Sequence, residues 1–195
     1  VTISNNLSCT GSLTLTNGCF TIGDYTISTA NVSGGSAGSY IKTNSNFDAS
    51  SPGFLKIINV SSTELKFPVG TNTGYNPCFI KNTGTTRDFS VRVFPGIYLN
   101  GLSGDAFTGQ NIDPMVNRTW EVTPDDPDGV NVELKLQWNG TDEGTHFSSN
   151  RSTAQVFKNR HISGDNTWKQ EGEATLSGSD PYQISVSGIT TFSTF

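Results

Sequence analysis

The stretch VNVELKLQW, residues 130–138, has the most regular alternation of side chains in the chain. Its apolar positions are Val130, Val132, Leu134, Leu136 and Trp138. Polar or charged side chains occupy every position between them. Successive side chains of a β-strand point to opposite faces of the sheet. The stretch therefore predicts a strand with one face in a hydrophobic core and the other in water.

Other alternating stretches flank this strand on both sides. They lie at residues 63–69, 88–94, 117–122, 153–159 and 182–195. Turn signals separate them, including Asn139-Gly140 and the run PDDPDG at residues 124–129. No segment sustains the 3.6-residue period of an amphipathic helix. The pattern predicts an all-β chain whose main body is an antiparallel β-sandwich.

The N-terminal third differs in composition. The 195-residue chain has 12 Lys and Arg and 17 Asp and Glu residues, but residues 1–63 contain only Asp24, Lys42, Asp48 and Lys56. Three short apolar–polar units follow one another in LTLTNGCFTIGDYTIS, residues 13–28. They are consistent with a meander of hairpins or with rungs of a short β-solenoid. We expect this Ser/Thr/Gly-rich segment to pack on a sandwich domain of residues 64–195, as two subregions or as one continuous unit.

Charge and hydropathy exclude two classes of partner. Only 15% of residues are charged, the net charge is −5, and no Lys/Arg cluster occurs, so nucleic-acid binding is not expected. No apolar stretch approaches 18 residues, so no membrane span is expected. The surface is rich in Ser, Thr, Asn and Gly, which is typical of secreted or cell-surface β proteins. Because the chain opens at Val1 without a signal-peptide pattern, we expect it to come from a longer precursor.

The three cysteines, Cys9, Cys19 and Cys78, leave at least one thiol free or in an intermolecular bridge. Cys9 and Cys19 could pair across neighbouring strands. Cys78 is packing filler if it is buried, and a possible link to another domain if it is exposed. The absence of CxxC spacing argues against a structural zinc site.

Three groupings of reactive side chains are candidates for catalysis. They are Glu171 with Glu173; Asp142, Glu143 and His146 in TDEGTH; and Cys78 with His146 or His161. Glycosidases need two carboxylates at a defined separation, and a nucleophilic thiol needs an adjacent base. The chain has no nucleophile elbow and no HExxH motif. We therefore expect a solvated loop at residues 141–146, an inert thiol at Cys78, and no enzymatic activity.

Asp125, Asp126 and Asp128 gather in one turn and are weak candidates for calcium ligands, because oxygen-rich turns of β-sandwiches can hold this ion. The turn lacks the spacing and distal Glu of an EF-hand loop. A solvated acidic turn without metal is the favoured interpretation, and no other cofactor is expected.

Aromatic side chains beside amides and carboxylates are the candidates for carbohydrate binding. Trp120 and Trp138 lie in phase with aliphatic residues and are expected in the core. Trp168 has only polar neighbours, among them Asp165 and Asn166, and is the best candidate for an exposed platform.

The uncharged stretch FPVGTNTGYNPCFI, residues 67–80, is expected to form a corner between two strands. Tyr75 within it is a weaker sugar-binding candidate. The favoured interpretation places its ring as a plug at the sandwich end, with its hydroxyl bonded to backbone.

Four stretches in order resemble a known domain class. They are LTLTNGCFTIGDYTIS, FPVGTNTGYNPCFIKN, VNRTWEVTPDDPDGVNVELKLQWNGTDEGTHF and SVSGITTFSTF. The set resembles the β-rich stalk or repeat domains near the C-terminus of large Bacteroidota cell-surface proteins exported by type IX secretion. Thr194 stands where proline is common in that class, Cys78 where an apolar residue or Thr is usual, and the secretion signal is not in this sequence. The resemblance implies an extracellular or cell-surface location and a non-catalytic role.

Two functions are therefore considered. The first is a structural or adhesive surface domain, acting as a spacer, adhesin segment or assembly subunit that contacts other surface proteins or itself through sheet edges. It predicts packed tryptophans and no deep pocket. The alternative is a carbohydrate-binding module attached to a polysaccharide-degrading enzyme. It predicts Trp168 or two tyrosines exposed on one face or in a groove.

Overall fold

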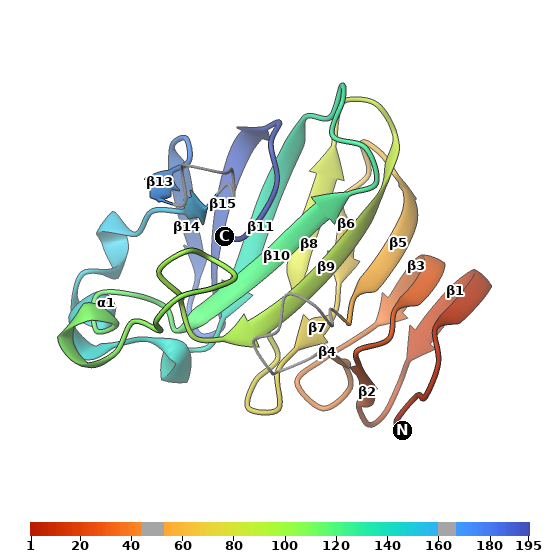
Figure 1. The fold of residues 1–195 in the computed structure, drawn as a ribbon, viewed down its shortest axis with the longest axis horizontal. Coiled ribbons are helices and arrows are strands. Elements are labelled where there is room, and N and C mark those ends of the chain that lie inside the picture. The colour runs from red at the N-terminus through yellow and green to blue at the C-terminus, as the bar shows by residue number, and fades with distance from the viewer. Residues whose placement is uncertain (44–52, 160–166) are drawn as a thin grey trace.

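The computed structural model describes residues 1–43, 53–159 and 167–195 of the chain, and these are strand-rich (Figure 1). The longest helix among them is α1 (Thr145–Ser149), and the other helical segments are the short 3₁₀ turns η1 (Gly109–Asn111), η2 (Gly140–Asp142) and η3 (Arg151–Thr153). The prediction of an all-β chain is confirmed. No helix in the described part is long and apolar enough to cross a membrane.

Two five-stranded sheets make up most of the molecule. The first has the order β1 (Leu7–Leu15), β3 (Ile27–Gly34), β5 (Leu55–Val60), β9 (Arg87–Pro95) and β10 (Arg118–Pro124). The second has the order β14 (Ala174–Gly178), β15 (Tyr182–Ile189), β11 (Val132–Trp138), β8 (Cys78–Asn82) and β6 (Leu65–Phe67). Smaller sheets join β2 (Phe20–Gly23), β4 (Ile41–Thr43) and β7 (Val69–Gly70), and pair β12 (Phe157–Asn159) with β13 (Trp168–Gln170).

Strand β11 is the predicted strand at residues 130–138, beginning two residues later than expected. It lies in the middle of its sheet and pairs antiparallel with β8 and β15. Leu134 and Leu136 are buried, whereas on the opposite face Glu133 and Lys135 are half-buried and only Gln137 is buried. The period-2 pattern thus identified the face that enters the core.

Strand β9 is buried on both faces, which its sequence did not predict. Val91 and Val93 point into the core as expected, but Arg92 and Phe94 on the other face are also buried. Arg92 pairs with Glu121 at 2.5 Å between Nε and Oε2, and its guanidinium lies 5.3 Å from the ring centre of Phe54. A charged side chain reaches this interior because a carboxylate and aromatic rings replace its water.

The N-terminal strands stack in parallel. β1 pairs with β3 and β3 with β5, while β2 pairs with β4 and β4 with β7, always in parallel. Consecutive strands therefore lie in different sheets, which is the pairing of stacked rungs and not of a hairpin meander. The Asn17-Gly18 turn, with Gly18 at φ +78°, carries the chain from one sheet to the other.

The corner at residues 67–80 differs from expectation in its tyrosines. The ring of Tyr75 packs against Tyr40 with centroids 5.5 Å apart, but the Tyr75 hydroxyl has no hydrogen-bond partner among the described residues. The backbone bond predicted for it is made instead by Tyr40, whose hydroxyl donates to the Thr71 carbonyl at 2.8 Å. Burial raises the pKa of Tyr75 to about 12. Gly70 is required by close approach, because a Cβ there would lie 2.5 Å from the Tyr40 ring.

The thiols are all free. Cys78 is fully buried, and burial raises the pKa of its thiol, so it acts as packing filler. Cys9 and Cys19 are both half-buried and do not form the disulfide considered for them.

Candidate functional site

In the acidic turn at residues 124–129, the carboxylates of Asp125 and Asp126 are engaged by neighbouring backbone and by Arg87. Asp125 accepts hydrogen bonds from the backbone N–H groups of Asp88 and Asp126, and Asp126 accepts one from the N–H of Asp128. Arg87 pairs with Asp126 at 2.7 Å. No group of three or more His, Cys, Asp or Glu side chains suited to a metal ion occurs in the described ranges. These hydrogen bonds and the ion pair account for the carboxylates of Asp125 and Asp126.

The candidate catalytic groupings separate in space or are engaged elsewhere. Glu171 pairs with the buried ammonium of Lys158 at 2.8 Å, while Glu173 is exposed. In TDEGTH, His146 is exposed on α1 and the two acids have separate partners, described below. The expected solvated loop is wrong for Asp142, which is buried because Arg118 reaches it from β10. His161 lies outside the described residues.

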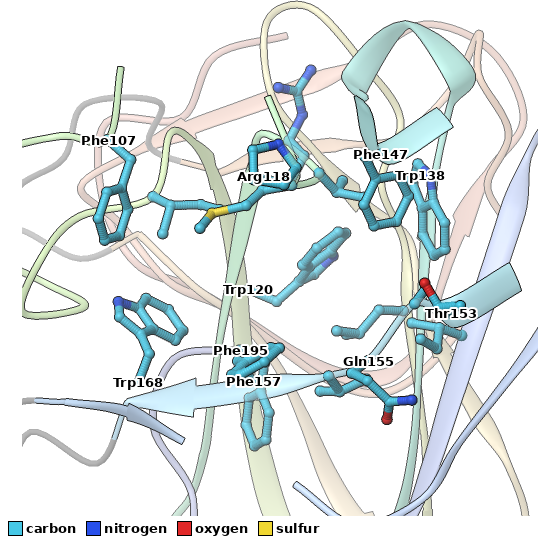
Figure 2. A pocket seen from close by; sticks show the side chains of 18 of the residues that line it. Phe107, Arg118, Trp120, Trp138, Phe147, Thr153, Gln155, Phe157, Trp168 and Phe195 are labelled. Carbon is cyan, nitrogen blue, oxygen red and sulfur yellow. The ribbon is translucent and has the colours of Figure 1, made fainter. Parts of the chain in front are cut away.

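A pocket of about 570 Å³ is lined by residues of β10, β11, α1 and β13 (Figure 2). In Figure 1, α1 and β13 lie at the opposite end of the molecule from β1. All three tryptophans of the chain border the pocket, together with four phenylalanines: Trp120, Trp138, Trp168, Phe107, Phe147, Phe157 and Phe195. In Figure 2 Trp120 lies in the middle, with Trp168 and Phe107 on one side and Trp138 and Phe147 on the other.

Each indole is held by a hydrogen bond from its ring nitrogen. Nε1 of Trp120 donates to the Asn76 carbonyl at 2.9 Å, and Nε1 of Trp168 donates to the Tyr98 carbonyl at 2.9 Å. Nε1 of Trp138 donates to a carboxylate oxygen of Glu143 at 2.7 Å. With their polar edges satisfied by protein, the rings can offer only apolar surface. Most of it comes from the half-buried Trp168, because Trp120 and Trp138 are only 3% and 2% exposed.

A charged clamp fixes the wall that contains Trp138. Glu143 has a side chain only 1% exposed and accepts two hydrogen bonds from Arg151, at 2.7 and 2.5 Å. This contact raises the pKa of Arg151. The Arg151 guanidinium lies 3.9 Å from the ring centre of Tyr182, and that ring packs at 6.0 Å from Trp138. The clamp holds the Trp138 ring in place without offering a free charge to the cavity.

Arg118 also borders the pocket, but its guanidinium points away from it (Figure 2). The group donates to Asp142 at 2.5 Å and to Asn76 and Thr73 at 3.1 Å each. Burial lowers the pKa of Arg118, and the neighbouring Asp142 acts against that shift. These hydrogen bonds connect β10 to the 67–80 corner and to η2, and they fix the position of Arg118 at the edge of the pocket.

Apart from the buried Arg118, the polar side chains of the lining lie at the exposed rim: His146, Asn150, Thr153 and Gln155. Asn150 donates its side-chain N–H to the His146 carbonyl at 2.9 Å, and its side-chain oxygen has no hydrogen-bond donor among the described residues. No carboxylate and no lysine is among the described residues that line the pocket. The lining thus suits a neutral ligand with an apolar face.

The chain matched no family model, no curated protein and no solved structure. The resemblance to Bacteroidota surface domains and the export that it implies therefore stay predictions.

The sequence-predicted sugar-binding residues are only partly brought together. Trp168 lies at the pocket, half-buried, whereas Tyr75 packs on Tyr40 and does not line it. Asp165 and Asn166 lie outside the described residues. Trp120 and Trp138 are buried as predicted, yet they also border the pocket. The alternation of their strands predicted that they are buried, but it did not predict a pocket beside them.

Proposed function

We propose that this chain is a non-catalytic adhesive domain of a cell-surface or secreted protein, and that it binds carbohydrate in the aromatic pocket. We interpret its architecture as a β-sandwich that carries a short solenoid-like stack of rungs. The observation that carries the proposal is the convergence of Trp120, Trp138 and Trp168 on one cavity, with every indole N–H already bonded to protein. The same pocket suits an adhesin segment or a module beside a polysaccharide-degrading enzyme, because both roles need only binding.

The chemistry of the lining favours a sugar ring. A pyranose presents C–H groups on its faces and hydroxyl groups around its edge. Aromatic rings on the walls match the faces, while the amides of Asn150 and Gln155 and the Thr153 hydroxyl at the rim match the edge. The volume of about 570 Å³ lies within the range of roughly 300–1,000 Å³ found for small-molecule sites.

A binding role without catalysis is supported by the engagement of the nearby acids. Asp142 and Glu143 are the carboxylates closest in sequence to the pocket residues of α1, and each is held by an arginine. Neither lines the cavity. A hydrolase would need a pair of carboxylates facing the bound sugar.

The test is a binding screen of the folded chain on neutral plant and marine polysaccharides, by glycan array and affinity electrophoresis. We expect saturable binding, and we expect Trp168→Ala to weaken it about tenfold or more, because stacked aromatic anchors dominate such sites. Tyr25→Ala, which removes an exposed aromatic ring away from the pocket, is the matched control and should bind normally. The proposal fails if no polysaccharide binds, or if Trp168→Ala and Tyr25→Ala bind alike.

A second candidate function is that of an assembly subunit. It is favoured by β1, which pairs with β3 on one side and with no other strand among the described residues on its other side. Its sequence, LSCTGSLTL, has no charged residue and no proline to protect that edge. A second copy of the chain is the occupant that we consider, with two β1 strands joined antiparallel about a two-fold axis.

A further inference from the structure

A second cavity adjoins the aromatic pocket. It has a volume of about 450 Å³ and is bordered by Leu99, Asn100, Phe107, Thr167 and Trp168. Phe107 and Trp168 also border the first pocket. These two aromatic side chains therefore stand where the two cavities meet.

The loop that contributes Leu99, Asn100 and Phe107 to the second cavity is held by hydrogen bonds of its own. The N–H of Leu99 donates to the Asp105 carbonyl at 3.0 Å, and the N–H of Phe107 donates to the Ile97 carbonyl at 2.8 Å. The bond from Nε1 of Trp168 to the Tyr98 carbonyl ties this loop to β13. Trp168 is thus held between the cavities by both elements that border them.

Both cavities carry an exposed apolar side chain. Phe157, 47% exposed, borders the first cavity, and Leu99, 53% exposed, borders the second. Five large apolar side chains are exposed among the described residues, and two of them lie here. Exposed apolar surface on both sides of Trp168 indicates a binding site longer than one sugar ring.

We propose that the two cavities are adjoining subsites for one neutral oligosaccharide, which passes over Trp168 and is recognised along its length. This inference rests on the proposed carbohydrate function and specifies its ligand as a chain of several units. A monosaccharide would fill one subsite only, whereas a longer chain would contact both aromatic walls. A neutral ligand fits both linings, which contain no carboxylate and no lysine among the described residues. The guanidinium of Arg118 in the first lining points away from the cavity and is paired with Asp142.

The experiment is calorimetric titration of the folded chain with β-1,4- and β-1,3-linked glucose oligomers, from the monosaccharide to the hexasaccharide. We expect the affinity for one of these series to rise about tenfold or more between the disaccharide and the longer members, as the second subsite fills. Trp168→Ala should weaken binding of short and long members alike, because its ring borders both cavities.

The Leu99→Asp variant tests the second subsite independently of the first. It places a charge in the second cavity only, so it should lower the affinity for the hexasaccharide about fivefold or more while that for the disaccharide is unchanged. Leu7→Asp, the same change at an exposed leucine of β1, is the control and should alter neither. Affinity that does not depend on length, or a Leu99→Asp variant that binds the hexasaccharide normally, would overturn the two-subsite proposal alone. If no oligomer and no polysaccharide of the screen binds, both proposals are wrong.

Discussion

At the scale of the residue, buried charged side chains of this protein are stabilised by the hydrogen bonds that surround them. The side chains of Arg118 and Asp142 are 7% and 3% exposed. Asp142 also accepts hydrogen bonds from Asn76 at 2.7 Å and from the backbone N–H of Asn139 at 3.1 Å. Removing one partner of such a pair leaves the other charge buried without compensation, which costs more than the pair itself contributes.

We predict that Asp142→Ala lowers the free energy of unfolding by about 3–5 kcal/mol. The measurement is urea unfolding followed by tryptophan fluorescence. Glu133→Ala is the control, because the partly exposed pair of Glu133 with Lys81 at 3.6 Å should contribute no more than about 1 kcal/mol. Equal losses in the two variants would show that burial of the Arg118 pair does not matter.

Single elements differ in how well their edges are protected. β10 is an edge strand of its sheet, but the C-terminal residues cover it: the N–H of Trp120 donates to the Phe195 carbonyl at 2.9 Å, and the N–H of Phe195 donates back to Trp120 at 2.8 Å. β1 has no comparable cover among the described residues. Since unpaired backbone groups on a long, uncharged edge favour pairing with another strand, β1 is where self-association is expected.

If the assembly candidate is correct, the unmodified chain should form a dimer whose proportion grows with concentration. Thr10→Lys places a charge in the exposed middle of β1 and should keep the chain monomeric at every concentration tested. Sedimentation velocity checks this, with Thr141→Lys on the exposed surface of η2 as the matched control. A dimer that persists in Thr10→Lys would show that β1 is not its interface.

At the scale of the whole molecule, one sheet crosses the predicted boundary near residue 63. β5 lies before the boundary and β9 after it, and the two strands pair antiparallel. The core is also shared, because Ile27 and Leu55 belong to the same buried cluster as Val91 and Leu134. The composition shift at this boundary therefore does not coincide with a break in packing.

We predict that the chain unfolds in one cooperative transition. Separating residues 1–63 from the remainder would expose the edge of β9 and the apolar residues of the common core, so neither part should be stable alone. Differential scanning calorimetry checks this by comparing calorimetric and van't Hoff enthalpies. Two separate transitions would instead support two independent domains, and expression of a stable fragment of residues 64–195 would do the same.

The parts of the fold that depend on a local side-chain pattern could be predicted from the sequence. The alternation at residues 130–138 indicated both the strand and its buried face, and the in-phase positions of Trp120 and Trp138 indicated their burial. The candidate site was predicted only at Trp168. The burial of Arg92 and the hydrogen-bond network of Asp142 were not predicted. A charged residue normally indicates a solvent-exposed position unless its partner is known.

The sequence by itself determined that this protein is built of strands, because side-chain alternation and turn residues act over a few positions. It also limited the charge and the reactive groups that any site could use. Only the tertiary structure decided that the N-terminal strands stack in parallel, that Arg118 meets Asp142, and that three distant tryptophans border one cavity. These features depend on contacts between residues far apart in the chain, and a pocket in particular is space left by packing, which no local pattern records.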